Sequence, residues 1–393
     1  MKINLLLYSH DWFPLVGGVQ TITLSLATGL AEWSKSHPGE SFEVTFVTQT
    51  PANGMDDSKF PFRVVRRPSL RELIKLIRRA DVVDLAGPSL LPLALTKVLQ
   101  KLSVLEHHGY QSICPNGLLV YEPDHAVCPG HFMAGRYHKC IHCNKKDMGL
   151  IGSIRSLGLT FPRRWLAKQA TMNVGVSPHV AQRVELPRTI AIWNGVPETP
   201  EPQYVGEPGV DQQCICFGYL GRLVTEKGLP VLLRASRELA AKGYSFRLRI
   251  VGDGPERASL EKLAQDYGLA DRTEFVGSVP AAAIPETLRG VSVIVMPSVW
   301  EDVAPLVAME QMMDGRLLIA SDIGGLSQIA ADGGLVFPAG DANALSVQMH
   351  QVLTDPVGTV NLRKKGRRKA LTTFTVGRMV AEHVDRYRSL VRH

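Results

Sequence analysis

The sequence predicts an α/β protein built from two Rossmann-like, doubly wound domains that face a central cleft. Short aliphatic segments alternate with stretches of helical periodicity along most of the chain, which is typical of parallel sheets covered by helices. A chain of 393 residues is longer than one hydrophobic core usually accommodates, so two domains of about 150 to 200 residues are expected. A proline-rich, aperiodic stretch at residues 197–213 separates two sets of strand–helix units.

The first domain is expected to span residues 1–198. Residues 2–8 form the expected first strand, and a loop at residues 11–18 leads into an apolar-periodic helix at residues 19–30. A cysteine-rich insert at about residues 107–146 follows a later strand. The further strands of this domain are expected at residues 42–48, 82–85, 103–106, 172–176 and 190–193.

The second domain is expected to span residues 214–372, after a linker at residues 199–213. Helices are expected at residues 229–242 and 257–267, between strands. The chain then ends in residues 373–393, which are expected to form a helix that packs back on the first domain. The strands of the second domain are expected at residues 214–220, 246–251, 273–276 and 293–295.

Composition narrows the class of protein. Hydrophobic residues make up 45% of the chain, enough to fill two cores. No apolar run approaches the ~18 residues needed to cross a bilayer, and the N-terminus turns polar too soon for a secretory signal. A cytoplasmic enzyme is therefore expected. The net charge of +7 favours acidic partners, but it does not choose between phosphate groups, anionic lipid and nucleic acid.

The segment around Asp302 and Glu310 carries the strongest chemical signal. A buried-type strand at residues 293–295 ends at a loop, and Pro305 suits the first turn of a helix that begins near Ala304. The free amides of that turn can bind an anion. Glu310 then lies about six residues into the helix, or ~9 Å along it, so the two carboxylates can contact different parts of one elongated ligand. A nucleotide sugar has that shape.

This segment resembles the donor site of the retaining glycosyltransferases of family four, which have the GT-B fold. The family pattern is an acidic residue, seven others and then Glu, which Asp302 and Glu310 match, followed by a small-residue turn at Gly324–Gly325. Two positions depart from it. Asp302 stands where Glu is usual, with Glu301 beside it as an alternative, and Gln328 stands where an acidic residue is common. The resemblance implies that Glu310 accepts hydrogen bonds from the ribose and that Asp302 holds sugar hydroxyls.

Phosphate binding is expected from glycine turns and fixed cations. Gly17 and Gly18 occupy the first strand-to-helix turn, although an ordinary tight turn that binds no ligand would explain the two glycines equally well. Arg222 and Lys227 follow the first strand of the second domain and match the glycine–arginine–leucine and lysine–glycine turns of the family, which implies that they bind the diphosphate. No catalytic metal is then needed. The remaining donor-site residues implied by the resemblance are Gly277 at the base and the helix-start residues Val303, Ala304, Pro305, Leu306 and Val307.

His108 follows a predicted strand in the sequence Glu-His-His-Gly-Tyr. A histidine at a strand end is usually an ordinary hydrogen-bonded residue. The resemblance implies instead that His108 reaches the donor sugar from the first domain, and its place six residues before Cys114 favours it over His107. Gly109 departs from the family, where Asp is common.

Four of the six cysteines cluster in the insert, and only one pair has the Cys-x-x-Cys spacing. Disulfides are disfavoured in a cytosolic chain. Either a structural zinc site or free thiols would account for the cluster. A catalytic zinc is disfavoured because four thiolates leave no open position. The proposed ligands are Cys114, Cys128, Cys140 and Cys143.

Basic residues crowd residues 63–79 and 363–369. Apolar residues recur at helical spacing within the first stretch, so one face can pack while the cations face outward. A solvated basic helix is the common outcome of such a pattern. The resemblance implies a second one, contact with anionic lipid near a lipid-linked acceptor.

The sequence therefore predicts a retaining glycosyltransferase. It would move a sugar from a UDP- or GDP-type sugar to a glycan, a lipid-linked acceptor or a small molecule. A sugar-nucleotide epimerase of the same fold is one alternative, although it needs acid–base groups at C2 of the sugar and none stand out. A nucleic-acid-binding zinc protein is the other, but the basic stretches lack interleaved aromatic residues for base stacking.

Overall fold

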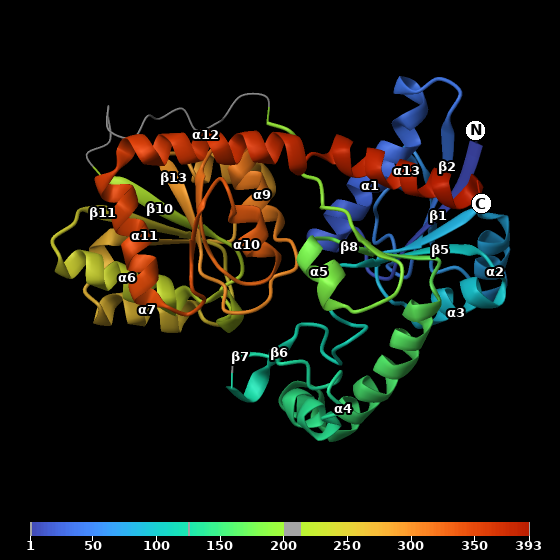
Figure 1. Ribbon diagram of the computed structural model, residues 1–393, viewed down its shortest axis with the longest axis horizontal. Helices are drawn as coiled ribbons and strands as arrows, with labels where there is room; N and C mark the ends of the chain where they lie inside the picture. Colours follow the sequence, from blue (N-terminus) through green and yellow to red (C-terminus); the bar gives the residue numbers. More distant parts are fainter. Residues whose placement is uncertain (1, 125, 200–213, 393) are drawn as a thin grey trace. The chain divides into compact units, whose positions relative to one another are not determined.

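The protein is described here by a computed structural model that covers residues 2–124, 126–199 and 214–392. The predicted linker, residues 199–213, lies outside the described residues apart from Thr199. The chain divides into two compact units (Figure 1). The first comprises Met1–Pro123, Cys128–Val196 and Phe374–His393, and the second comprises Asp124–Val127 and Pro197–Thr373.

The first unit is built on a seven-stranded parallel sheet with strand order β3-β2-β1-β4-β5-β8-β9. Its central strands are apolar and buried on both faces, as expected for a parallel sheet covered by helices. The order reverses direction between β1 and β4, which makes the sheet doubly wound. The strands are β1 (Lys2–Ser9), β2 (Ser41–Thr48), β3 (Arg63–Arg66), β4 (Val82–Leu85), β5 (Leu102–His107), β8 (Met172–Gly175) and β9 (Thr189–Ala191).

Helices cover both faces of this sheet (Figure 1). The last helix of the chain packs against the first, where Gly29 leaves room for Val380: a Cβ at position 29 would lie 2.5 Å from Cγ2 of Val380. The larger helices of the unit are α1 (Gly18–Ser36), α2 (Leu70–Arg79), α3 (Leu90–Val98), α4 (Tyr137–Gln169), α5 (Pro178–Arg183) and α13 (Val376–Arg392).

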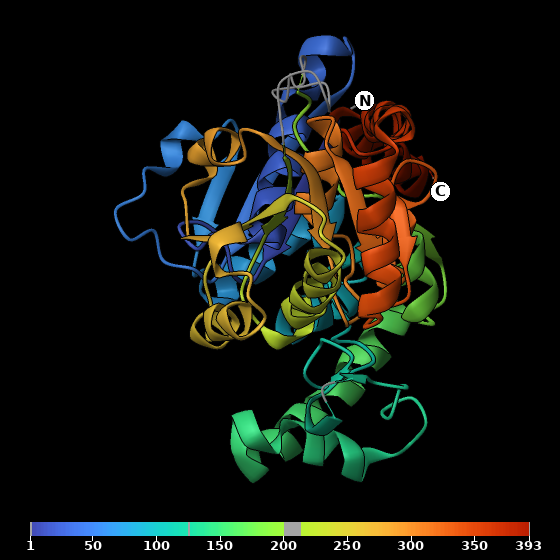
Figure 2. The same cartoon turned by 90° about the vertical axis from the view of Figure 1, so that its left-hand side faces the viewer.

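The cysteine-rich insert consists of short elements followed by α4. Its short elements are β6 (Val120–Tyr121), a 3-10 turn at Glu122–Asp124 and β7 (Ala126–Val127). Gly149, at φ 67° and ψ 177°, breaks α4 into two helical segments. The helix extends away from the seven-stranded sheet in both views (Figures 1 and 2). Much of α4 therefore lacks the cover that a sheet gives to the other helices.

The second unit is built on a six-stranded parallel sheet with strand order β12-β11-β10-β13-β14-β15. Side chains such as Phe217, Leu232, Ile250 and Val293 form its buried core. The strands are β10 (Ile215–Leu220), β11 (Phe246–Val251), β12 (Thr273–Gly277), β13 (Val291–Met296), β14 (Leu317–Ser321) and β15 (Leu335–Phe337). The helices are α6 (Leu229–Ala241), α7 (Arg257–Asp266), α8 (Ile284–Thr287), α9 (Leu306–Met313), α10 (Gly324–Ala330), α11 (Ala342–Thr354) and α12 (Pro356–Thr373).

The predicted fold class, two doubly wound parallel α/β units, is confirmed. Local differences have simple causes. The basic stretch 63–79 is a strand, β3, followed by α2, because Ser69 caps a new helix by accepting a hydrogen bond from the amide of Glu72. The helix expected from Ala304 begins instead at Leu306, with Pro305 at its N-cap.

The chain leaves and re-enters the first unit at one place. Val196 forms an isolated parallel bridge with Thr375, and its amide donates to the carbonyl of Phe374 at 2.7 Å. Gly195 is needed here, because a Cβ would lie 2.6 Å from Cα of Val376. The second unit is thus an insertion between two neighbouring backbone segments of the first.

Candidate active site

In the second unit, the strand order reverses between β10 and β13, the position where open α/β sheets bind ligands at the carboxyl ends of their strands. The turn after β10 carries Arg222 and Lys227, and the turn after β13 carries Asp302. Folding therefore brings together residues that are 75 positions apart in sequence.

Lys227 and Asp302 form the closest charged contact of this region. The ammonium lies 2.6 Å from Oδ2 of Asp302, and the two side chains are only 14% and 7% exposed. Ser298 donates a second hydrogen bond to Oδ2 at 3.1 Å, and the ammonium lies 5.4 Å from the ring centre of Trp300. The pair is largely shielded from water, so its attraction is stronger than that of a surface pair. A phosphate that binds Lys227 would compete with Asp302 for the same ammonium.

Two glycines allow the surrounding loops to approach closely. Gly228 has φ 67°, and a Cβ there would lie 2.0 Å from the carbonyl oxygen of Pro297. Gly324 has φ 64°, and a Cβ there would lie 2.4 Å from the carbonyl oxygen of Asp302. The amide of Gly325 donates to that same carbonyl at 2.7 Å. The predicted glycine turn thus holds the backbone of Asp302 in place.

The other glycine turns of this edge have a packing role. A Cβ at Gly252 would lie 1.9 Å from the carbonyl oxygen of Gly221, and one at Gly254 would lie 2.3 Å from that of Leu223. The amide of Gly252 also donates to the carbonyl of Gly277 at 2.9 Å. These contacts join the turns after β10, β11 and β12 into one continuous edge.

Glu310 lies in the second turn of α9, and Pro305 gives that helix no side-chain cap. Burial raises the pKa of Glu310, and the nearby charge of Asp314 raises it further. Arg316, which the sequence analysis overlooked, is buried beside them and donates to Asp314 and Gln311, both at 2.8 Å. This arginine anchors the end of α9 against β13 through the carbonyl of Val291.

In the first unit, His107 and His108 have different environments. His107 is fully buried and hydrogen-bonds Asn173 at 3.0 Å, and burial lowers its pKa to about 4. His108 lies beside a pocket of about 860 Å³. Residues that follow β1, β4 and β5 line this pocket, including His10, Asp11, Gly87 and Gln111. Gly17 and Gly18 begin α1, whose next residue, Val19, lines the same pocket.

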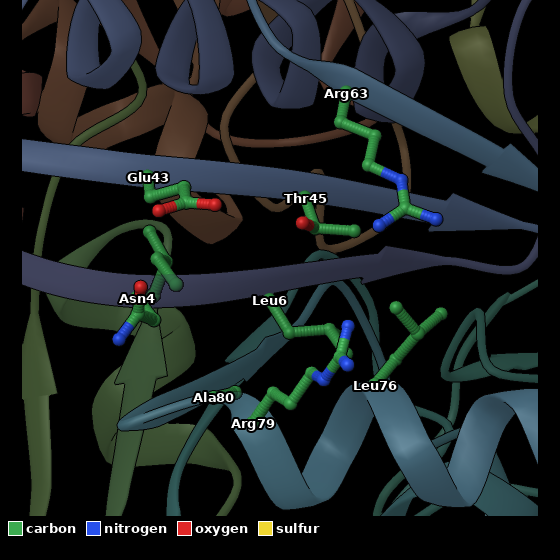
Figure 3. Close-up of a pocket in the computed structure, with 9 residues that line it drawn as sticks. Asn4, Leu6, Glu43, Thr45, Arg63, Leu76, Arg79 and Ala80 are labelled. Atoms are coloured by element: carbon green, nitrogen blue, oxygen red, sulfur yellow. The ribbon is translucent and has the colours of Figure 1, made fainter.

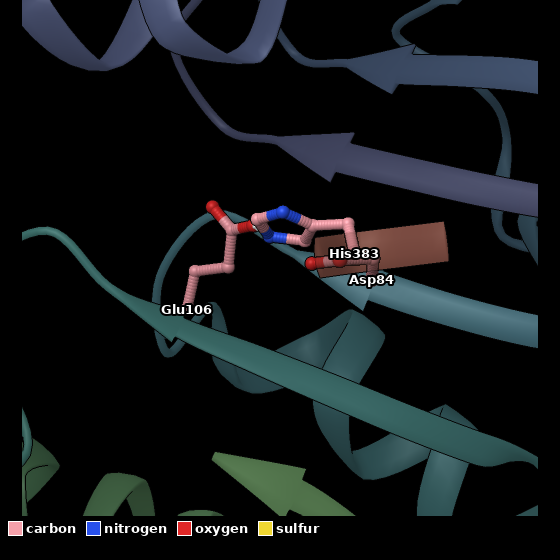
Figure 4. Close-up of side chains that lie close together, drawn as sticks. All are labelled: Asp84, Glu106 and His383. Atoms are coloured by element: carbon pink, nitrogen blue, oxygen red, sulfur yellow. Dashed lines mark hydrogen bonds and ion pairs between the residues drawn. The ribbon is translucent and has the colours of Figure 1, made fainter. Parts of the chain in front are cut away.

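A buried chain of hydrogen bonds lies behind His108, and Figure 4 shows two of its members, Glu106 and His383, beside Asp84. Nε2 of His108 lies 2.6 Å from one carboxylate oxygen of Glu106, and Nε2 of His383 lies 2.9 Å from the other. Nδ1 of His383 donates to the carbonyl of Met379 at 2.8 Å. The phenol of Tyr387 donates to Asp84 at 2.5 Å. Helix α13 therefore supports the residue that His108 contacts.

The charges of this cluster follow from its contacts. Burial by itself would raise the pKa of Glu106, but hydrogen bonds from His108 and His383 lower it well below its usual value. Burial opposes the charged form of His383 too, but the hydrogen bond and charge of Glu106 raise the pKa of His383. Burial and the charge of Glu106 raise the pKa of Asp84. The arrangement is the carboxylate of Glu106 held between two imidazoles, with the buried carboxyl of Asp84 close by.

Sequence reasoning overlooked Glu106, His383 and Asp84. A charged residue inside an otherwise apolar strand was the available signal, since Glu106 and Asp84 interrupt β5 and β4. Within the part of the chain that the structure describes, these three residues are the only set of three or more His, Cys, Asp or Glu side chains whose ligand atoms all lie within 4.8 Å of one another.

A second groove, of about 290 Å³, lies along β1, β2 and β3 beside α2 (Figure 3). Arg63 and Arg79 reach over it, and Glu43 on its wall pairs with Lys2 at 2.6 Å. Its lining begins at Asn4, near the start of β1, rather than at the carboxyl ends of the strands. We assign no function to this groove.

The four cysteines of the insert are buried, and none of them forms a disulfide. Asn116 connects two of them: its Oδ1 accepts from Cys114 at 2.9 Å, and its Nδ2 donates to the sulfur of Cys143 at 3.6 Å. The amide of Glu122 also donates to the sulfur of Cys143, at 3.4 Å. Burial, together with the charges of Cys114, Cys128 and Cys143, raises the pKa of Cys140 to about 12.

Sequence comparisons place the chain among glycosyltransferases. The model of the family "Glycosyl transferases group 1" matches residues 204–370. The chain is 27% identical over 263 residues to 2-deoxystreptamine glucosyltransferase of Streptomyces kanamyceticus, covering 61% of this chain and 67% of that protein. It is 32% identical over 174 residues to a GDP-mannose-dependent phosphatidylinositol monomannoside mannosyltransferase of Mycolicibacterium smegmatis, covering 42% and 46%. The second match spans less than half of the relative.

Solved structures match nearly the whole chain. The Anabaena protein HepE in complex with UDP superposes with a TM-score of 0.69 at 16% identity, covering 99% of this chain and 100% of that one. Sucrose-phosphate synthase from Thermosynechococcus elongatus superposes with a TM-score of 0.69 at 19% identity, covering 99% of each. At these identities the likeness shows the GT-B fold. Residues 204–370 match the glycosyl transferases group 1 family, and the whole chain has the GT-B fold of the solved structures, so the matches together indicate a glycosyltransferase.

Proposed function

We propose that this glycosyltransferase transfers a sugar from a UDP- or GDP-type donor to an acceptor hydroxyl, with retention of configuration. The Lys227–Asp302 contact at the strand reversal of the second unit carries the proposal, because it places a cation and a carboxylate where a diphosphate and a sugar would meet. A UDP-bound structural relative and a GDP-mannose-dependent sequence relative support this class of donor.

The donor contacts follow from the geometry. Lys227 and Arg222 would bind the diphosphate, and Arg222, whose side chain is 66% exposed, is accessible for this. The backbone amides of Leu306 and Val307, at the start of α9, would stabilise the charge of the leaving group, and the preceding residues Val303, Ala304 and Pro305 would line the same site. Glu310 would accept from the ribose hydroxyls, and Gly277 would contact the base. Asp302, with Glu301 as the alternative, would hold sugar hydroxyls after a phosphate draws Lys227 away.

The chemistry needs no protein nucleophile and, in this proposal, no catalytic metal. The bond between the anomeric carbon and the phosphate oxygen breaks, and the cations and helix amides stabilise the departing diphosphate. The acceptor oxygen bonds to the anomeric carbon on the face that the phosphate leaves. At the same time a phosphate oxygen takes the proton of the acceptor hydroxyl. Lys227 is thus expected to act mainly in the transition state, where the charge on the leaving group is largest.

His108 would contact the donor sugar from the first unit. Glu106 already engages its Nε2, so Nδ1 is the ring nitrogen left for substrate. The pocket beside His108 would take the acceptor. Glycans, lipid-linked sugars and small molecules all qualify: one relative is named for 2-deoxystreptamine, another for a phosphatidylinositol monomannoside. No helix in the described part of the chain is long and apolar enough to span a membrane, and we propose that the enzyme works in the cytoplasm.

Nucleotide binding tests this proposal directly. Thermal unfolding should shift upward with UDP or GDP and remain unchanged with DNA or RNA. Slow hydrolysis of one nucleotide sugar from a panel, without acceptor, would then identify the donor. If UDP, GDP and ADP all leave the unfolding temperature unchanged, the donor site proposed here is wrong. A shift with nucleic acid alone would favour a nucleic-acid-binding protein.

We also propose that Cys114, Cys128, Cys140 and Cys143 hold a structural zinc ion. Their burial, their mutual proximity and the N–H groups that face the sulfur of Cys143 suit thiolate ligands. No three of these sulfurs lie within 4.8 Å of one another, so metal binding would have to draw them together. Metal analysis of protein prepared in metal-free buffer should find one zinc per chain. Full thiol titration of a folded, zinc-free protein would show free thiols instead.

A further inference from the structure

Helix α4 presents an unusual surface in its second segment, residues 150–169. Apolar side chains that are normally buried are exposed there: Ile151 is 84% exposed, Trp165 57%, Ile154 51% and Phe161 45%. Large side chains of this kind are rarely grouped on the surface of a soluble domain. The group therefore needs a physical explanation.

These side chains share one face of the helix. Exposed positions recur every three or four residues along residues 151–169, which is the period of a single helical face. The adjoining face is buried at Ser153, Leu157 and Thr160, and Leu157 packs in a cluster with Phe132 and Cys140. The helix is thus amphipathic, yet its exposed face carries Ile151, Ile154, Phe161 and Trp165. We call this set the α4 stripe.

The charged residues of the helix segment that carries the α4 stripe are all basic, and the nearby carboxylate of Glu185 faces Arg164. Residues 148–169 contain four arginine and lysine residues and no aspartate or glutamate. Arg155 and Lys168 are exposed, and at 100° per residue they lie on opposite edges of the stripe. An apolar face bordered by cations matches the interface of an anionic lipid layer, where apolar side chains enter the acyl boundary and cations meet the headgroups.

The same helix contributes to the pocket that holds His108. Arg163, two residues before Trp165, lines this pocket together with Arg67. Leu91 of α3, which is 54% exposed, lines it as well. The pocket thus combines two guanidinium groups, suited to a phosphate, with an apolar residue on its wall.

We infer that the α4 stripe lies on an anionic lipid surface and that the His108 pocket takes its acceptor from that surface, as a lipid with an anionic headgroup. The choice of acceptor rests on the proposed function, whereas binding of the stripe to lipid does not. The stripe is distinct from the basic residues of α2, which surround no comparable group of exposed apolar side chains.

Vesicle sedimentation tests the inference. The full chain should bind vesicles of phosphatidylcholine mixed with phosphatidylglycerol and bind phosphatidylcholine alone much more weakly. The double variant Ile151→Ser, Trp165→Ser should weaken binding by about tenfold or more for each apolar side chain removed. The matched control is Val347→Ser, Val357→Ser in the second unit, where the two side chains are 61% and 72% exposed, and it should bind like the unchanged protein.

Three results would overturn the inference: no preference for anionic vesicles, equal binding by the stripe variant and its control, or a lipid-free dimer that the stripe variant abolishes. The last result would assign the stripe to a second copy of the chain. Thermal shifts with UDP and GDP, measured without vesicles on all three proteins, report the donor site separately. Lost vesicle binding with intact nucleotide shifts supports the stripe, and absent shifts in every protein count against the donor site alone.

Discussion

The carboxyl edges of the two parallel sheets support chemistry in different ways. In the second unit, the important side chains lie in or beside turns that follow individual strands, and Lys227 and Asp302 touch directly. In the first unit, His108 depends on Glu106, which in turn is held by His383, 277 positions later in the chain. One edge is assembled from neighbouring strand–helix units, whereas the other needs the last helix of the chain.

The difference explains why the two edges respond differently to change. In the second unit an exposed side chain such as Arg222 can be removed at the cost of one contact, whereas removing Lys227 leaves the largely buried Asp302 without its ion-pair partner. A change in the buried cluster of the first unit leaves a charge without its partner in a low-dielectric interior, which costs more stability.

Lys227→Ala and Glu310→Ala should affect activity most. Each removes a group that contacts the donor in the proposed site, so kcat should fall by about 10²- to 10³-fold, as for the loss of one preorganised transition-state contact. Lys242→Ala, at an exposed position after α6, is the matched control. Steady-state kinetics with the identified donor measures the effect, and circular dichroism checks the fold. Near-normal turnover in either site variant would refute its assigned role.

Glu106→Gln should have a smaller effect on rate. The amide keeps the shape of the side chain but can no longer hold both imidazoles as a carboxylate, so His108 loses its fixed tautomer. We expect kcat to fall by about 10- to 100-fold, comparable to the loss of other supporting contacts. The pH at which kcat is half-maximal should shift in this variant. A variant that only destabilises the fold would lower kcat at every pH and keep the same pH dependence.

Gly228→Ala compared with Gly243→Ala separates close packing from backbone strain. Both glycines have positive φ, at 67° and 83°, so alanine costs about 1–2 kcal/mol of backbone energy at either position. Only Gly228 would also place a Cβ against another backbone atom, the carbonyl oxygen of Pro297. Urea unfolding should show the larger loss for Gly228→Ala. Equal losses would mean that the donor-site loops tolerate separation.

The His383–Glu106 contact should make stability depend on pH. Because folding raises the pKa of His383, its contribution is fully present below the unfolded value of 6.5 and is lost as pH rises through the folded value. Glu106 acts oppositely: its pKa is lowered, so its contribution is present above 4.5 and is lost as pH falls.

As pH rises above 6.5, the free energy of unfolding should fall by up to about 1.4 kcal/mol per pH unit. His383→Gln removes the titrating imidazole and should flatten the dependence above pH 6.5. Denaturant titrations of both proteins at several pH values measure the difference. An unchanged slope in the variant would show that His383 does not supply it.

The same contrast between the two units explains which elements and site residues can be predicted from the sequence. Alternating strands and helices predicted the doubly wound class, because that pattern is local. The three-residue β15 and four-residue β3 are too short to give a clear periodic signal, and both were missed. Arg222, Lys227 and Asp302 were noticed because each follows a predicted strand. His383 was not, since only the packing of α13 against α1 and β5 brings it to Glu106.

The bridge between Val196 and Thr375 has a consequence for protein engineering. Because the two connections of the second unit meet at neighbouring backbone atoms, residues 197–373 form a cassette with adjoining ends. Exchanging this cassette with that of a relative would change the donor machinery without cutting the seven-stranded sheet. Gly195 should be retained in such a chimera, since its Cβ-free backbone lets the entering and leaving strands share one junction.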